Sequence, residues 1–99
     1  MIENEEKAIL AARGEDWHAR IEAERYLAAH GELPTLTRLA CEDDWRVRLV
    51  AARALAQHGA SPREILRILD NRLEEEQDSW VLKNLKWGVR EQAARATSN

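Results

Sequence analysis

The sequence predicts an all-α domain of three stacked helical hairpins, about six helices in all. Three observations support this prediction: a segment that begins Asp-Trp recurs along the chain, apolar residues follow helical spacing, and turn-forming residues are few. The 99 residues are 44% hydrophobic and 33% charged, with 4 Gly and 2 Pro. This composition is too apolar for a disordered chain and too poor in turn residues for a β-sandwich.

The repeat is clearest in the first half of the chain. Asp-Trp-His-Ala-Arg at 16–20 recurs 28 residues later as Asp-Trp-Arg-Val-Arg at 44–48, and both copies end in His-Gly. A third, degenerate copy begins at Asp78. A step of 35 residues would align Trp80 with Trp45, whereas a step of 34 aligns Asp78 with Asp44. We prefer the second register because it also aligns the apolar residues, although Leu82 then replaces the arginine.

Each element has its own start and stop signals. The expected helices cover 2–13, 16–30, 34–42, 44–58, 62–77 and 79–95, and they pair into units 2–31, 33–59 and 61–95 of a single domain, 1–99. The first helix has a polar start that suits a cap on the array. Asp43 or Asp44 is the expected N-cap of the fourth helix, and Gly31 and Gly59 are expected to end the second and fourth helices in the left-handed conformation.

The remaining helices follow the same logic. Gly-x-x-Pro precedes both the third and the fifth helix, and Ser61, Pro62 and Glu64 predict a capping box at the start of the fifth. Its buried face is expected to include Ile65, Leu66, Leu69 and Leu73. The apolar face that is expected to pack against the neighbouring helices is clearest in the fourth helix. There, Val47, Ala51, Ala54 and Leu55 form one stripe at helical spacing.

The Asp-Trp-x-Val-Arg start, followed by Ala-Ala-x-Ala-Leu and a terminal Gly, resembles the second helix of a HEAT repeat, in particular the short type found in phycobilisome-lyase proteins. The resemblance implies a short right-handed α-solenoid that presents a surface to another macromolecule. It also implies a ladder between neighbouring repeats, formed by Asp16 and Asp44 with Arg20 and Arg48. Trp17 and Trp45, in the first turns of equivalent helices, are expected to pack between helices as structural residues.

The last helix is a candidate for a partner-binding or dimer-forming face, and packing of its two tryptophans inside the monomer is the alternative. Trp80 and Trp87 are seven residues apart, so they share one face of the helix, together with Lys83 and Arg90. Tryptophan and arginine are enriched at interaction hot spots. Arg46 and Arg53, also seven apart, form a second candidate face on the fourth helix.

Neither catalysis nor cofactor binding is expected. The three histidines lack metal-ligand spacing, and no phosphate-binding glycine loop or nucleophile–base pattern occurs. Cys41 is expected to be a buried, inert thiol. The acidic N-terminus and the absence of a long apolar run predict a protein without a signal peptide or membrane span, located in the cytoplasm.

These observations predict a non-enzymatic protein–protein interaction module, such as an inhibitor, immunity or adaptor protein, whose partner is another protein. A homodimer is one alternative. The second is a nucleic-acid-binding accessory protein that uses the arginine-rich face, although the net charge of −3 is unlike that of most nucleic-acid binders.

Overall fold

The computed structural model describes residues 2–98, and this part of the chain contains six α-helices and no strand. Their bounds are α1 Glu5–Arg13, α2 Trp17–His30, α3 Leu33–Leu39, α4 Trp45–Gln57, α5 Pro62–Glu75 and α6 Ser79–Thr97. The predicted all-α class is therefore confirmed.

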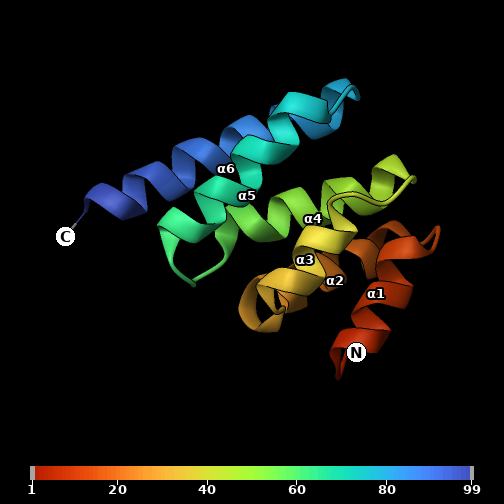
Figure 1. Cartoon of the computed structure of the whole chain (residues 1–99). Helices are drawn as coiled ribbons and strands as arrows, with labels where there is room; N and C mark the ends of the chain where they lie inside the picture. Colours follow the sequence, from red (N-terminus) through yellow and green to blue (C-terminus); the bar gives the residue numbers. More distant parts are fainter. Residues whose placement is uncertain (1, 99) are drawn as a thin grey trace.

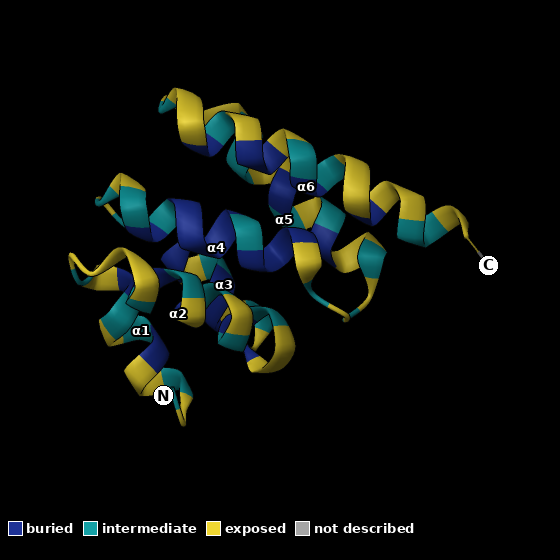
Figure 2. Cartoon of the chain, turned by 180° about the vertical axis from the view of Figure 1, so that it is seen from behind, coloured by how far each residue is buried: buried dark blue, intermediate teal, exposed yellow. Residues whose placement is uncertain are grey.

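The helices form stacked hairpins along one direction. α1 packs against α2, α3 against α4, and α5 against α6, while α2, α4 and α6 pack side by side. Figure 1 shows α4 between the α1–α2 end and the α5–α6 end of the array. Because α4 contacts the other five helices, it forms the centre of the molecule. Figure 2 shows the buried residues continuing along α4.

The second helix of each hairpin begins in the same way. Asp16, Asp44 and Asp78 are the N-caps of α2, α4 and α6, and each carboxylate accepts hydrogen bonds from backbone N–H groups of its own first turn. This geometry corresponds to the 34-residue step between the second and third copies. Val47 and Val81, which that step aligns, are both buried.

The third helix is shorter than expected. It ends at Leu39, because the N–H groups of Cys41 and Glu42 donate to the carbonyls of Arg38 and Leu39, closing a tight turn instead of a further helical turn. Cys41 therefore lies on this turn and is exposed, so the expectation of a buried thiol is wrong.

Two local predictions about caps are also wrong. No glycine of the described chain has a positive φ, and Gly31 has φ −67°. A side chain at Gly31 would instead meet the Leu27 carbonyl oxygen at 2.6 Å, so this position requires glycine because the backbone approaches closely. Ser61 is the N-cap of α5, with Pro62 at N1, but its hydroxyl makes no capping hydrogen bond.

The C-terminal ends of α2 and α4 are closed by side chains of the next hairpin. The His58 ring accepts from the Ala60 N–H through Nδ1, which leaves Nε2 to donate to the Gly31 carbonyl at 2.6 Å. The fully buried Gln92 amide of α6 donates to the carbonyls of Leu55 and Ala56 at the end of α4. Carbonyls that a helix leaves unpaired are thus satisfied across the hairpin interfaces.

Candidate functional site

A groove of about 730 Å³ runs across α2, α4 and α6, and we call it the tryptophan groove. Trp17, Trp45 and Trp80 line it, one from each hairpin, and their side chains are 53%, 39% and 62% exposed. Trp17 and Trp45 were expected to pack between helices, and both are exposed where they line the groove. The partner-face candidate Trp80 does lie on an open surface.

Helix starts explain why the three indoles gather. Trp17 and Trp45 are the first residues of α2 and α4, and Trp80 is the second residue of α6. In a stack of hairpins the second helices run in the same direction, so their first turns meet along one edge. The repeated Asp-Trp start places Trp17 and Trp45 at equivalent positions of α2 and α4, whereas Trp80 lies one residue further into α6.

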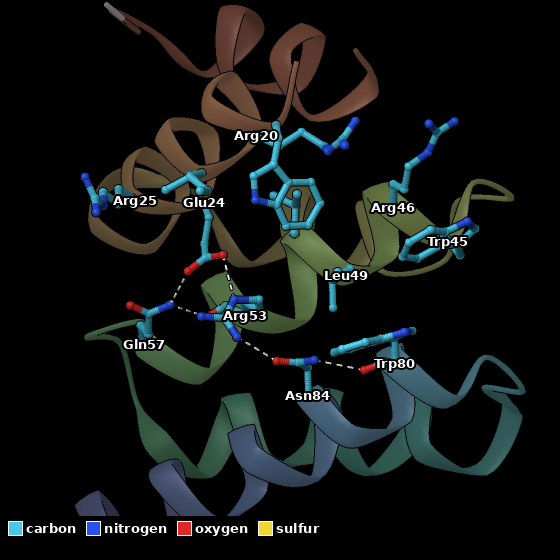
Figure 3. A pocket seen from close by; sticks show the side chains of 13 residues that line it. Arg20, Glu24, Arg25, Trp45, Arg46, Leu49, Arg53, Gln57, Trp80 and Asn84 are labelled. Carbon is cyan, nitrogen blue, oxygen red and sulfur yellow. Dashed lines mark hydrogen bonds and ion pairs between the residues drawn. The ribbon is translucent and has the colours of Figure 1, made fainter. Parts of the chain in front are cut away.

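Apolar side chains of α2 and α4 form the floor between the indoles. Ile21, Leu49 and Val50 line the groove, and Val50 is buried beneath it. Figure 3 shows the Leu49 side chain pointing from α4 toward the Trp80 ring on α6. The groove therefore offers apolar contacts flanked by flat aromatic surfaces.

A polar network crosses the groove and links all three hairpins (Figure 3). The Arg53 guanidinium of α4 donates to Glu24 of α2 at 2.7 Å and to the Asn84 side-chain oxygen of α6 at 2.8 Å. Gln57 donates to the second oxygen of Glu24, also at 2.7 Å. These contacts hold α2, α4 and α6 in register beneath the groove.

This network changes the roles of two predicted partner-binding residues. Arg53 is held by Glu24 and Asn84, and its guanidinium also lies 5.1 Å from the ring centroid of Trp87. Trp87 is half-buried, and it is not among the residues that line the groove. The structure therefore separates Trp87 from Trp80, although the two share a helix.

Three further arginines line the groove, namely Arg20, Arg25 and Arg46. Arg46 pairs with Asp44 at 3.3 Å. The pKa of the Asp44 carboxyl is lowered, chiefly because it accepts the Arg46 backbone N–H and also because the Arg46 guanidinium is close. Asp44 therefore stays ionised, and it neutralises part of the charge of Arg46.

The motif arginines brace loops, and neither makes a direct ion pair with an aspartate of a neighbouring repeat among residues 2–98, although Arg20 is near enough to help lower the pKa of Asp44. Arg20 donates to the carbonyl of Gly14, and Arg48 donates to those of Glu42 and Asp43, in each case within the loop that precedes its own helix. The contact of Arg48 with the next hairpin is an ion pair with Glu76 at 2.9 Å. Asp16 and Asp44 are occupied as N-caps, so the acceptor between repeats is a glutamate.

Glu76 was missed because it lies among the extra residues that precede the third copy. Its side chain is only 2% exposed and pairs with both Arg48 and Arg72. Burial opposes ionisation, but hydrogen bonds from Arg48 and from the Asp78 backbone N–H outweigh it and lower the pKa of Glu76. A run of glutamates gives no sign of which member turns inward.

The last two predicted partner residues lie outside the groove. Lys83 places its ammonium 5.8 Å from the Trp80 ring centroid, within range of a cation–π contact. Arg90 is exposed on α6, further along the helix from the groove.

Within residues 2–98, no group of three or more His, Cys, Asp or Glu side chains is placed to hold a metal ion. In the same part of the chain, no helix combines the length and apolar character needed to cross a bilayer.

Stacked helical hairpins with a groove across their second helices define an α-solenoid. A family model described as HEAT repeats matches residues 5–85, so the chain belongs to the HEAT-repeat family. No curated protein and no solved structure matches the sequence.

Proposed function

We propose that this chain is a non-enzymatic protein-interaction module and that its partner binds in the tryptophan groove. HEAT repeats generally mediate protein–protein interaction. One observation carries the proposal: three hairpins each contribute an exposed tryptophan to a single groove. Large aromatic side chains beside arginines are the residues that most often dominate binding energy at protein interfaces.

The size of the chain suits a protein that acts by covering a partner's surface, as an inhibitor, immunity or adaptor protein does. The cytoplasmic location predicted from the sequence belongs to the same proposal, as does assignment of the repeats to the short type of phycobilisome-lyase proteins.

The nucleic-acid alternative is weaker than the sequence alone implied. It required Arg46 and Arg53 to be available together for phosphates, whereas Arg53 is bound to Glu24 and Asn84. Substituting Arg53 would also disturb the network that links the hairpins. A loss of binding in such a variant would therefore not distinguish the two functions.

Site-specific cross-linking in the native host tests the proposal. The photoreactive p-benzoylphenylalanine replaces Trp45 in the groove or, as a control, Arg67 on the exposed side of α5. We expect a covalent adduct with a discrete protein from the groove position and none from the control. Equal adducts from both positions, or adducts from the control alone, would rule out the groove as the binding site.

The affinity for the cross-linked partner provides the second measurement. Trp80→Ala is expected to weaken binding by about 30-fold, since hot-spot side chains contribute about 2 kcal/mol or more. Leu10→Ala is the matched control, because Leu10 on α1 is also 62% exposed but lies outside the groove. Its effect is expected to stay below about twofold.

A further inference from the structure

Arg20 is an unusual residue in the wall of the groove. The residue is only 8% exposed, and its guanidinium lies 4.9 Å from the ring centroid of Trp17. One of its terminal nitrogens donates to the Gly14 carbonyl, but the buried Nε has no acceptor in the described chain. Because Nε is itself buried, an anionic ligand can reach Arg20 only through its other terminal nitrogen, Nη2, which has no hydrogen-bond acceptor among residues 2–98.

The charges around the groove point to the same class of ligand. Four arginines and a single carboxylate, Glu24, line it, whereas the whole chain has a net charge of −3. Glu24 is bound to Arg53, and Arg25 makes no ion pair with any residue among 2–98. The groove is therefore a local cationic surface on an acidic protein.

Its apolar part restricts the ligand further. Trp45, Trp80 and Leu49 offer contact surface that a free inorganic anion would leave uncovered. A ligand that satisfies both parts carries carboxylates together with aliphatic or aromatic side chains. Neighbouring packed helices lie about 8–10 Å apart, so the distance from α2 to α6 is about 20 Å. An extended chain covers this distance with about six residues.

We propose that the groove binds an extended acidic segment of a partner protein, with carboxylates facing Arg20, Arg25 and Arg46 and with apolar side chains between the indoles. This inference rests on the function proposed above and specifies the chemistry of the partner. A single acidic segment explains the arginines and the tryptophans together.

A nucleic acid fits the same surface less well. The N-cap carboxylates of Asp16, Asp44 and Asp78 lie beside the three tryptophans, at the starts of α2, α4 and α6. A phosphate backbone carries one charge at every nucleotide and would meet these carboxylates along the whole edge. A peptide places its charges only where an arginine faces them.

Selection from a random peptide library tests the inference directly. Phage displaying random peptides of about twelve residues are selected on the immobilised full chain. We expect the enriched peptides to carry more Asp and Glu than the starting library, together with aliphatic or aromatic residues. Enrichment of neutral or basic peptides, or no enrichment at all, would overturn the inference.

Fluorescence anisotropy with an enriched peptide then locates the contact. The double variant Arg25→Gln/Arg46→Gln is expected to lose affinity about tenfold or more. The matched control, Arg63→Gln/Arg67→Gln on the exposed side of α5, makes the same charge change away from the groove, so a loss below twofold is expected. Equal losses in both variants would show a general charge effect and overturn the inference.

Two comparisons separate the remaining outcomes. Replacing the peptide's Asp and Glu by Asn and Gln should weaken its binding to the wild-type chain more than to the double variant. A single-stranded oligothymidylate of about twelve nucleotides should bind more weakly than the peptide at physiological salt; tighter binding would overturn the inference. The p-benzoylphenylalanine that replaces Trp45 could still cross-link to a protein while only neutral or basic peptides are selected. In that case the proposed function stands and the acidic ligand does not.

Discussion

Arg48 shows how much one side chain contributes to holding two hairpins together. Its guanidinium donates to the carbonyls of Glu42 and Asp43 and pairs with Glu76 of the next hairpin. The position of this arginine was predicted from the repeat, but its acceptor was not. The acceptor depends on where the longer helix α5 ends, because Glu76 directly follows it, and the spacing of the repeat carries no information about that end.

Replacing Arg48 by methionine is expected to lower the free energy of unfolding by about 3 kcal/mol, because it leaves the carboxylate of Glu76 buried with one partner fewer. Arg72 still pairs with Glu76, which keeps the loss at the lower end of the range for a broken buried pair. Urea unfolding measures it. Arg63→Met on exposed surface is the control and should change stability by less than about 0.5 kcal/mol. A loss below about 1 kcal/mol for Arg48→Met would contradict the prediction.

The same carboxyl makes stability depend on pH. The folded pKa of Glu76 lies below its value of about 4.3 in an unfolded chain, so its contribution is complete above that value and is lost as the pH falls through the folded pKa. We expect the urea midpoint to fall between about pH 5 and pH 3. The fall should be smaller in Glu76→Gln, which carries no titrating group. Parallel curves for the two proteins would refute the assignment.

The exposure of Trp17 and Trp45 differs from what the sequence predicted. Trp17 and Trp45 were expected to pack between helices because they lie in the first turns of equivalent helices, yet both are exposed. A repeat places equivalent residues on one common side. The first-turn positions of Trp17, Trp45 and Trp80 were sufficient to predict a shared edge, but not to show whether that edge was covered.

At the scale of the helix, the N-terminal ends were more predictable than the C-terminal ends. Asp16, Asp44 and Asp78 act as caps through atoms within their own first turns, which is local chemistry that a sequence shows directly. The C-terminal ends of α2 and α4 are instead closed by His58 and Gln92 of the following hairpins. Contacts between residues so far apart in the chain are set by packing, so the predicted glycine caps were wrong.

The two repeat-ending glycines are expected to respond oppositely to alanine. Gly31→Ala should destabilise the protein by about 1–3 kcal/mol, because its Cβ would lie 2.6 Å from the Leu27 carbonyl oxygen. Gly59→Ala meets no atom within 4 Å and has no positive φ, so it should be neutral or stabilising by up to about 1 kcal/mol. Thermal unfolding of both variants tests this, and equal effects would contradict it.

For the whole molecule, three hairpins are the minimum that buries the seam of a solenoid. The central helix α4 is buried from two sides, by α2 and by α6. The recurrence of Asp16, Asp44 and Asp78 was sufficient to predict this stacking. The groove was only partly predictable, because Glu24 and Asn84, the partners of Arg53, do not recur in the other copies of the repeat.

A chain shortened to residues 1–60 is therefore expected not to fold cooperatively, because it loses the α6 side chains that cover α4 and close its last turn. Circular dichroism during urea unfolding should show low helicity and no sigmoidal transition. A chain ending at Ala96 is the control, since it retains Gln92 and Arg95, and it should unfold as the full chain does. A sharp transition in the shorter chain would show that two hairpins suffice.

The network beneath the groove also restricts how this array could lengthen by gene duplication. Arg53 faces Glu24 on the preceding hairpin, whereas the 28-residue step places Ala52 at the corresponding position of the middle hairpin. A tandem copy of that hairpin would set a guanidinium against a methyl group and leave the cation without a counter-ion. An added hairpin of this kind would therefore join the array without the ion pair that ties α4 to α2, unless an acid replaced Ala52.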